Sequence, residues 1–155
     1  MRDNFMCPAC GNSEDIQSSI EERHVKESYG DVIYYELEIF KCPKCDTEGD
    51  ADESNNEKRR KAHQKSDYTV VKNIVEYFNG IGISTINLEM SFGMYQLIQK
   101  ALYNYEKDKK PIERSLVVLL QLTRMYPFLL MADDIAQHFR LGYKDEDEFI
   151  RKVFK

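Results

Sequence analysis

The four cysteines of the chain fall into two pairs of the same spacing, Cys7-Pro8-Ala9-Cys10 and Cys42-Pro43-Lys44-Cys45. A gap of two residues lets both thiolates of a turn face one ion, and four thiolates complete the closed tetrahedral shell of a structural zinc site. Because such a shell leaves no position open for water, the spacing argues against catalytic zinc. We therefore predict one structural Zn²⁺ ion, bound by Cys7, Cys10, Cys42 and Cys45.

Other uses of these cysteines fit the sequence less well. Nothing near Met1 resembles a secretory signal peptide, so we expect a cytoplasmic protein, in which disulfides are rare. A thioredoxin-like redox motif needs one CxxC pair in a βαβ setting, whereas this chain has two pairs. His24 and His63 are expected to be surface histidines, since four cysteines already fill the shell. Iron bound by four thiolates uses similar pairs, and spacing alone does not distinguish it from zinc.

The segment between the two pairs predicts a β-hairpin that ends at the second pair. Residues 16–25 form one candidate strand, Ser28-Tyr29-Gly30-Asp31 has turn chemistry, and residues 32–40 are rich in β-branched and aromatic side chains. Cysteine pairs at the ends of a small sheet are typical of a zinc ribbon. A module of about 45 residues buries little core, so metal binding should supply much of its folding free energy.

A polar segment at residues 51–67 separates this module from the rest of the chain. It has no aliphatic side chain larger than Ala, and we predict a linker, partly helical, between a domain at 1–50 and a domain at 68–155. The net charge of −5 comes from residues 1–66, where 15 acidic residues outnumber 10 basic ones. This acidity suits a basic protein partner and argues against non-specific nucleic-acid binding. No apolar run is long enough to span a membrane.

From Thr69 onward the apolar residues recur with helical spacing. A first helix is expected to end at Gly80, a second to begin after the N-cap Ser84, a third to cover residues 95–105, and a fourth to begin at Pro111. Short helices separated by glycine turns outline a helix-turn-helix bundle. The predicted fold class is therefore α+β: a small N-terminal β zinc ribbon, a polar linker and an all-α helix-turn-helix bundle with a C-terminal extension.

Three blocks in the helical part carry a family resemblance. They are Tyr105-Glu106-Lys107-Asp108-Lys109-Lys110-Pro111, Leu116-Val117-Val118-Leu119-Leu120-Gln121-Leu122 and Tyr126-Pro127-Phe128-Leu129-Leu130. Together with the two cysteine pairs, these blocks resemble the MqsA family of antitoxins, also called YgiT-type zinc finger/helix-turn-helix proteins, over residues 5–131.

The resemblance implies a type II toxin-antitoxin system antitoxin that also represses its own operon. In that family the zinc domain binds the cognate protein toxin, and the helical domain binds operator DNA as a homodimer. The recognition-helix positions of the family fall on Lys100 and Asn104, and the neighbouring candidates for DNA contacts are Ser91, Tyr95, Gln96 and Gln99. Asn reads adenine in the major groove, and Lys reaches guanine or phosphate. Asp108 stands where the family has Gly, at the turn that ends this helix.

Two other functions stay open. The segment from Gly93 to Glu106 is longer than in the family, and the chain is acidic, which favours a zinc-containing protein-interaction module that does not bind DNA. The other is an enzyme or an iron electron carrier. The sequence shows no Ser-His-Asp or Cys-His arrangement and no phosphate loop, so we predict no catalytic residue. Asp133, Asp134 and His138 have helical spacing and are expected to be surface side chains.

Overall fold

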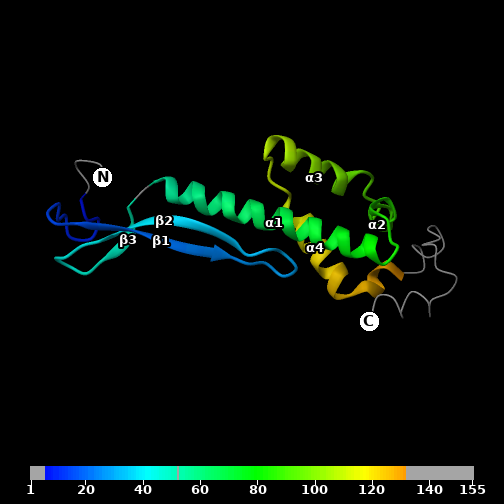
Figure 1. Cartoon of the computed structure of the whole chain (residues 1–155), viewed down its shortest axis with the longest axis horizontal. Helices are drawn as coiled ribbons and strands as arrows, with labels where there is room; N and C mark the ends of the chain where they lie inside the picture. The colour runs from blue at the N-terminus through cyan, green and yellow to red at the C-terminus, as the bar shows by residue number, and fades with distance from the viewer. Residues whose placement is uncertain (1–5, 52, 132–155) are drawn as a thin grey trace. The chain divides into compact units, whose positions relative to one another are not determined.

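The computed structural model describes residues 6–51 and 53–131, which form a small sheet followed by helices (Figure 1). This arrangement confirms the predicted α+β class. The C-terminal extension predicted after residue 131, including Asp133, Asp134 and His138, lies outside the described residues. The elements are β1 (Gln17–Val25), β2 (Ile33–Lys41), β3 (Glu48–Asp50), α1 (Ser54–Gly80), α2 (Thr85–Ser91), α3 (Leu97–Asp108), α4 (Arg114–Met125) and the 3-10 helix η1 (Pro127–Met131).

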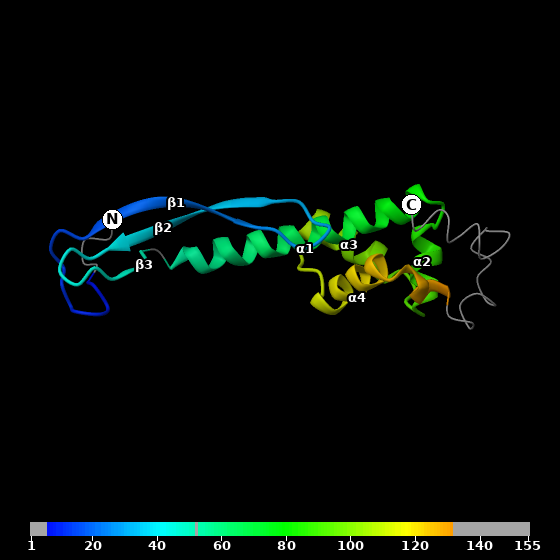
Figure 2. The same cartoon turned by 90° about the horizontal axis from the view of Figure 1, so that it is seen from below.

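The contacts between residues divide the chain into two units, each with its own buried cluster. The metal unit consists of Met1–Val25 and Val32–His63, and it holds all three strands and the start of α1. The helical unit consists of Lys26–Asp31 and Gln64–Lys155. It holds the rest of α1 and the helices that follow, which Figure 2 shows from a second side.

The sheet of the metal unit is antiparallel, with β2 between β1 and β3. β1 and β2 pair over their whole lengths, from Gln17 opposite Lys41 to Val25 opposite Ile33, which confirms the predicted hairpin. Successive side chains of a strand point to opposite faces. Ile33 and Leu37 are therefore buried on one face of β2, and Phe40 is buried on the other.

The short strand β3 was not predicted from the sequence. Its residues Glu48, Gly49 and Asp50 have weak β propensity. Gly49 lies opposite Phe40, and a Cβ atom at residue 49 would lie 2.9 Å from a ring carbon of Phe40. The strand forms because glycine leaves room for the phenylalanine ring beside it, a close approach that composition does not reveal.

The start of α1 is joined to the edge of β2 by a buried amide. The Asn55 side chain is fully buried; its Oδ1 accepts from the Glu38 N–H at 3.1 Å and its Nδ2 donates to the Glu38 C=O at 2.8 Å. The same Nδ2 also lies 3.1 Å from Oδ1 of Asp50. Since a buried amide is costly unless it is hydrogen-bonded, these contacts fix where the helix begins against the strand.

α1 is longer than the sequence predicts. The prediction was a partly helical linker followed by a helix from Thr69, whereas one helix runs without a break from Ser54 to Gly80. Its polar first half is supported by local pairs, because Glu57 accepts from Arg60 three residues later and also lies 3.5 Å from Lys61. Such pairs stabilise the first half of the helix, which shows no apolar stripe.

Replacing Arg59 by Ala is expected to destabilise the metal unit by about 1 kcal/mol at pH 7. Arg59 donates to both Asp50 carboxylate oxygens at 2.6 Å, and solvent screens the pair because both side chains are about one-third exposed. The guanidinium holds the pKa of Asp50 below its usual value. The stabilisation is therefore complete above the unfolded pKa of about 3.9 and is lost as the pH falls through the folded pKa.

Urea unfolding at pH 6, 7 and 8 in excess Zn²⁺ measures this difference between the Arg59→Ala variant and the unmodified chain. A constant difference is expected across this range, since all three values lie far above the pKa of Asp50. A difference that vanishes, or that changes steadily with pH, would show that the ion pair is not the cause.

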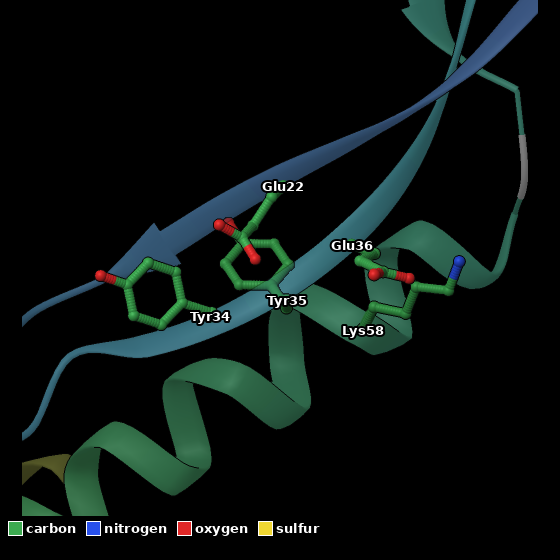
Figure 3. A pocket seen from close by; sticks show the side chains of 5 residues that line it. All are labelled: Glu22, Tyr34, Tyr35, Glu36 and Lys58. Atoms are coloured by element: carbon green, nitrogen blue, oxygen red, sulfur yellow. The ribbon is translucent and has the colours of Figure 1, made fainter.

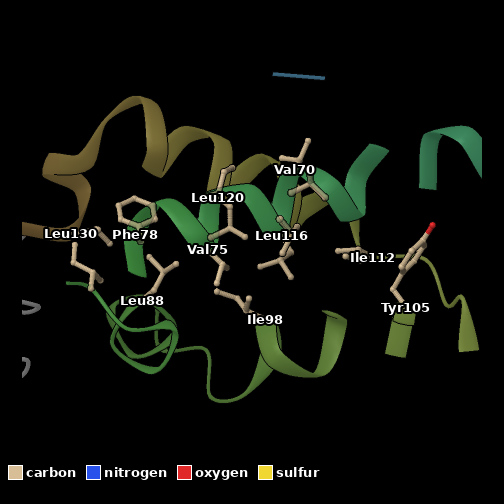
Figure 4. Close-up of a cluster of buried hydrophobic side chains, with 14 residues drawn as sticks. Val70, Val75, Phe78, Leu88, Ile98, Tyr105, Ile112, Leu116, Leu120 and Leu130 are labelled. Atoms are coloured by element: carbon tan, nitrogen blue, oxygen red, sulfur yellow. The ribbon is translucent and has the colours of Figure 1, made fainter. Parts of the chain in front are cut away.

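The helical unit is built around one apolar cluster (Figure 4). α1 contributes Val70, Val75 and Phe78, which Figure 4 shows facing side chains from the later helices. The apolar stripe predicted on this helix is therefore its buried face. The other labelled members of the cluster are Leu88, Ile98, Tyr105, Ile112, Leu116, Leu120 and Leu130.

The turn Lys26–Asp31 belongs to the helical unit. The Asp31 N–H donates to Oγ1 of Thr69 at 3.0 Å, and Nδ2 of Asn73 donates to the Tyr29 C=O at 3.0 Å. Gly30 is required here, because a Cβ atom would lie 2.7 Å from Cγ2 of Val70. The predicted turn chemistry thus provides close contact with α1.

Replacing Ser84 by Ala is expected to destabilise the helical unit by about 1 kcal/mol. Ser84 is the predicted N-cap of α2, and its Oγ accepts from the Asn87 N–H at 3.2 Å with extended backbone angles. Thermal unfolding followed by circular dichroism measures the loss. Ser84→Asp is the control, because aspartate caps a helix equally well and should keep the midpoint; equal losses in both variants would contradict a capping role.

Candidate metal centre

The four cysteine sulfurs lie together at one end of the sheet. Sγ of Cys7 is 3.7 Å from Sγ of Cys45, and Sγ of Cys10 is 3.7 Å from Sγ of Cys42. All four sulfurs lie within 4.8 Å of one another, and none forms a disulfide. Four sulfurs at about 2.3 Å from one tetrahedral ion are about 3.8 Å apart, so this spacing fits a single metal ion.

The two cysteine turns have the same backbone design. In the first, the Cys7 N–H donates to the Asn12 C=O and the Gly11 N–H donates to the Cys7 C=O, at 2.8 and 2.9 Å. In the second, the Cys42 N–H donates to the Thr47 C=O at 3.0 Å and the Asp46 N–H donates to the Cys42 C=O at 2.9 Å.

A left-handed residue closes each of these turns. Gly11 has φ 71° and Asp46 has φ 55°, and each lies four residues after the first cysteine of its pair. Glycine adopts this conformation without cost, and aspartate is among the side chains that tolerate it best. This geometry lets the two cysteines of a pair point to one side.

The site is covered on one side and open on the other. The first cysteine of each pair, Cys7 or Cys42, is buried, and the second, Cys10 or Cys45, is exposed. The buried cysteines pack with Phe40 at the end of β2, and Ile16 and Ala51 lie against this small cluster. Two of the candidate ligands, Cys7 and Cys42, are therefore held in the buried cluster, and the other two, Cys10 and Cys45, lie at the surface.

Hydrogen bonds divide the thiols into easily and poorly ionised ones. The hydroxyl and the backbone N–H of Thr47 lower the pKa of Cys45 to about 6. Burial raises the pKa of Cys42, but the backbone N–H groups of Lys44 and Cys45 outweigh it and lower this pKa. For Cys10, the Asn12 N–H lowers the pKa, yet desolvation and the neighbouring sulfurs raise it to about 12. Metal binding would displace the remaining protons, since thiolates are the ligand form.

The donor set is that of a soft metal ion. Four thiolates suit zinc, and iron uses the same donors. Within the described residues, the four cysteines are the one group of three or more His, Cys, Asp or Glu side chains placed to bind a metal ion. His24 and His63 are exposed and are not part of this group.

Two polar side chains beside the sulfurs were not singled out from the sequence. Nδ2 of Asn12 lies 3.9 Å from Sγ of Cys42, and Oγ1 of Thr47 lies 3.2 Å from Sγ of Cys45. Hydrogen bonds to metal-bound ligands orient them and tune the metal. Each of these residues follows the second cysteine of a pair by two positions, and this repeated spacing was a signal that the sequence offered.

A buried glutamate holds the start of α3. Glu89 is 2 % exposed, and its Oε1 accepts from the Gln99 backbone N–H at 2.9 Å. The N-cap Gln96 is left-handed, with φ 58°, and offers no side-chain cap. Glu89 therefore takes the place of a capping residue, with its negative charge at the positive end of the helix.

Two of the six predicted DNA-contact residues are engaged within the helical unit. Ser91 is buried, and its hydroxyl donates to the Asn87 C=O at 2.8 Å. The Gln99 backbone N–H donates to Oε1 of Glu89, and the Gln99 side-chain Nε2 lies 3.5 Å from Oε2 of the same glutamate. The structure thus places Ser91 in α2 and Gln99 at the start of α3 as parts of the α2–α3 junction.

The other four residues lie on or next to α3. Lys100 and Asn104 are one helical turn apart, with Lys100 exposed and Asn104 half-buried. Tyr95, just before the helix, is 76 % exposed, and Gln96 is exposed at the N-cap position. These four residues therefore lie together in the segment 95–104, whereas Ser91 lies on the preceding helix, α2.

Comparisons of the chain with protein-family models, with curated proteins and with solved structures find no match. No helix among the described residues combines the length and apolar character needed to cross a bilayer. Of the features that the resemblance to the MqsA family implies, the structure supports a four-cysteine cluster close enough to bind a metal ion, as in a zinc finger.

Proposed function

We propose that the chain is a type II antitoxin and transcriptional autoregulator. Its metal unit, with a structural Zn²⁺ ion, binds the cognate toxin, and its helical unit binds operator DNA as a homodimer. The observation that carries the proposal is the cluster of four cysteine sulfurs within 4.8 Å, because a closed thiolate shell supports a docking fold and leaves no position for catalysis. That the partner is a toxin is inferred from the sequence blocks that resemble the MqsA family.

The α2–α3 pair supports the DNA-binding part. Two short helices joined by a turn with glycine are the outline of a helix-turn-helix, and here the turn contains Gly93 with φ 64°. α3 carries Lys100 and Lys107 on exposed positions, and Nζ of Lys107 lies 5.7 Å from the ring centroid of the exposed Tyr103. These groups are suited to phosphate contacts in a groove.

An apolar stripe on α4 supports the dimer. Side chains three or four residues apart lie on one face of a helix, and three such side chains of α4 are 41–51 % exposed. An exposed apolar helix face commonly marks a protein interface. The three side chains are Val118, Leu122 and Met125.

A second candidate function is a zinc-containing protein-interaction module that does not bind DNA. Its support is the burial of Ser91 in the α2–α3 junction, where its hydroxyl is already bonded to the Asn87 C=O, which withdraws one predicted contact from DNA. The acidic net charge of −5 also opposes binding to a polyanion.

Two measurements on the zinc-loaded chain decide between these functions. The first is capture of the protein encoded by the neighbouring gene, and the second is a gel shift with the DNA upstream of the chain's own gene. Binding of both ligands supports the antitoxin and autoregulator. Toxin binding without a gel shift at low salt supports the interaction module, and binding of neither rejects both functions.

Variants of α3 make the gel shift specific. Lys100→Ala combined with Asn104→Ala is expected to weaken operator binding at least about tenfold, because it removes a base contact and a phosphate contact. Lys72→Ala on α1 is the control for a lost positive charge and should change binding less than about twofold. Equal losses would indicate that α3 does not read the operator.

A further inference from the structure

The outer edge of β2 has a direction that the hydrogen bonds define. The Ala51 N–H donates to the Glu38 C=O at 2.8 Å, and the Cys42 N–H donates to the Thr47 C=O at 3.0 Å. Even-numbered residues of β2 thus direct their backbone groups to the β3 side. Because the direction alternates along a strand, the N–H and C=O groups of Tyr34 and Glu36 point to the same side.

β3 is too short to reach these groups. It pairs with β2 only from Lys41 opposite Glu48 to Ile39 opposite Asp50. At the next residue of β2, Glu38, the backbone N–H and C=O bond to the Asn55 amide instead. Within residues 6–51 and 53–131, no hydrogen bond on this edge reaches the backbone of Tyr34 or Glu36. An unpaired strand edge is a template for a further strand.

A hollow of about 430 Å³ lies beside this edge, within the metal unit. Figure 3 shows the side chains that line it, which come from β1, β2 and α1. They are Glu22, Tyr34, Tyr35, Glu36 and Lys58. An added strand would thus find space for side chains as well as backbone partners.

The hollow has a net negative charge, because two glutamates, Glu22 and Glu36, line it together with one cation, Lys58. Glu22 and Glu36 lie directly opposite each other in the β1–β2 register, and neither carboxylate has an ion pair within the described residues. Like charges in this position are destabilising, so a cation between them would relieve the repulsion. Tyr34, which is 63 % exposed, adds an aromatic face that attracts a cation.

We propose that the edge of β2 at Tyr34 and Glu36 is a docking site for an extended, basic segment of the partner protein. The segment adds a strand to the sheet through the backbone groups of these two residues and places a Lys or Arg side chain against Glu22 and Glu36. A second copy of this chain fits the edge poorly, because symmetric pairing brings two sets of the same glutamates together. The inference deepens the proposed function, on which it rests for the toxin as partner.

Proline tests the backbone part of the docking site. Proline is tolerated on an edge strand where its missing N–H faces solvent, so Tyr34→Pro should keep the fold while it blocks strand addition. Capture of the neighbour-encoded toxin by the zinc-loaded chain is expected to weaken at least about tenfold in this variant. Tyr34→Thr, which keeps the N–H and loses the ring, should weaken it less than about fivefold. Amide spectra of both variants verify that the sheet is intact.

Charge reversal tests the side-chain part. Glu36→Lys is expected to weaken toxin capture at least about tenfold, whereas the exposed Glu14→Lys, an equal charge change on the same unit, should change it less than about twofold. Full toxin binding by both Tyr34→Pro and Glu36→Lys would overturn the inference and leave the proposed function standing.

A synthetic peptide separates the inference from the toxin. With a blocked peptide of alternating Val and Lys, the amide signals of Tyr34 and Glu36 are expected to shift, and the matching Val–Glu peptide should leave them in place. If the chain captures no toxin, the proposed function fails, and these shifts still decide the inference. Absence of shifts with the Val–Lys peptide, or equal shifts with both peptides, overturns it.

Discussion

Removing the metal from the intact chain is expected to unfold the metal unit and to leave the helical unit folded. The metal unit buries few apolar side chains beyond Phe40, Leu37 and Ile33, and its four sulfurs repel one another once they ionise. Structural zinc contributes about 10–16 kcal/mol of apparent binding free energy at pH 7. This exceeds what so small a core supplies alone. The helical unit has the larger apolar cluster, and among its described residues there is no group of side chains placed to bind a metal ion.

Amide spectra before and after addition of excess chelator measure this outcome. Signals from residues 7–25 and 32–51 should collapse to unfolded positions, while those of α3 and α4 stay in place. Cys42→Ser should reproduce the collapse without chelator, and Ser13→Ala, a change beside the site that removes no sulfur, should not. Unchanged signals from residues 7–25 and 32–51 in metal-free protein would contradict a metal-dependent fold. Metal analysis should give one zinc per chain, and a coloured protein would identify iron instead.

Replacing Glu89 by Ala is expected to destabilise the helical unit by about 3 kcal/mol. The buried carboxylate accepts the Gln99 N–H at the start of α3, where no side-chain cap exists. Its loss leaves a buried donor without a partner, removes a charge that favours the helix N-terminus and opens a small cavity. Urea unfolding of the zinc-loaded chain, followed at the amides of α3 and α4, measures the change.

Glu89→Gln is the matched control, because the amide keeps an oxygen for the Gln99 N–H and loses only the charge. It is expected to destabilise the unit by about 1 kcal/mol. Hydrogen exchange at the Gln99 amide should accelerate strongly in the Ala variant and modestly in the Gln variant. If both variants unfold at the midpoint of the unmodified chain, Glu89 does not hold α3.

Local patterns were sufficient to predict the four-cysteine cluster and the hairpin. The spacing of each cysteine pair determines how two thiolates meet, and alternation in residues 33–41 determines which side chains share a face. The N-cap Ser84 was also predictable, because its hydroxyl acts on an N–H only three residues away. Each of these features is decided within a few residues of sequence.

Features that depend on distant partners were not predictable in this way. β3 exists because Gly49 accommodates Phe40, and α1 begins at Ser54 where Asn55 reaches Glu38. Glu89 was overlooked because its partner, Gln99, lies ten positions away across a turn. In each case the decisive neighbour comes from another element.

The end of α3 lies one residue later than the resemblance implied. The resemblance to the MqsA family places a glycine turn at Asp108, which is the last residue of the helix in the structure. The left-handed residue is Lys109, with φ 54°, and its backbone N–H bonds to the Tyr105 C=O at 3.0 Å. A helix boundary is set by the final hydrogen bond, which a motif alignment does not contain.

The amide of Asn55 has a consequence for how the strands align while the chain folds. A slide of β2 by two residues would keep every side chain on its proper face, so the apolar pattern alone does not prevent it. Such a slide would move Glu38 away from Asn55 and leave the fully buried Asn55 amide without its hydrogen bonds to the Glu38 backbone. The loss would cost about 1–3 kcal/mol. The Asn55 side chain, in the first turn of α1, thereby disfavours sheets in which β2 is paired out of register.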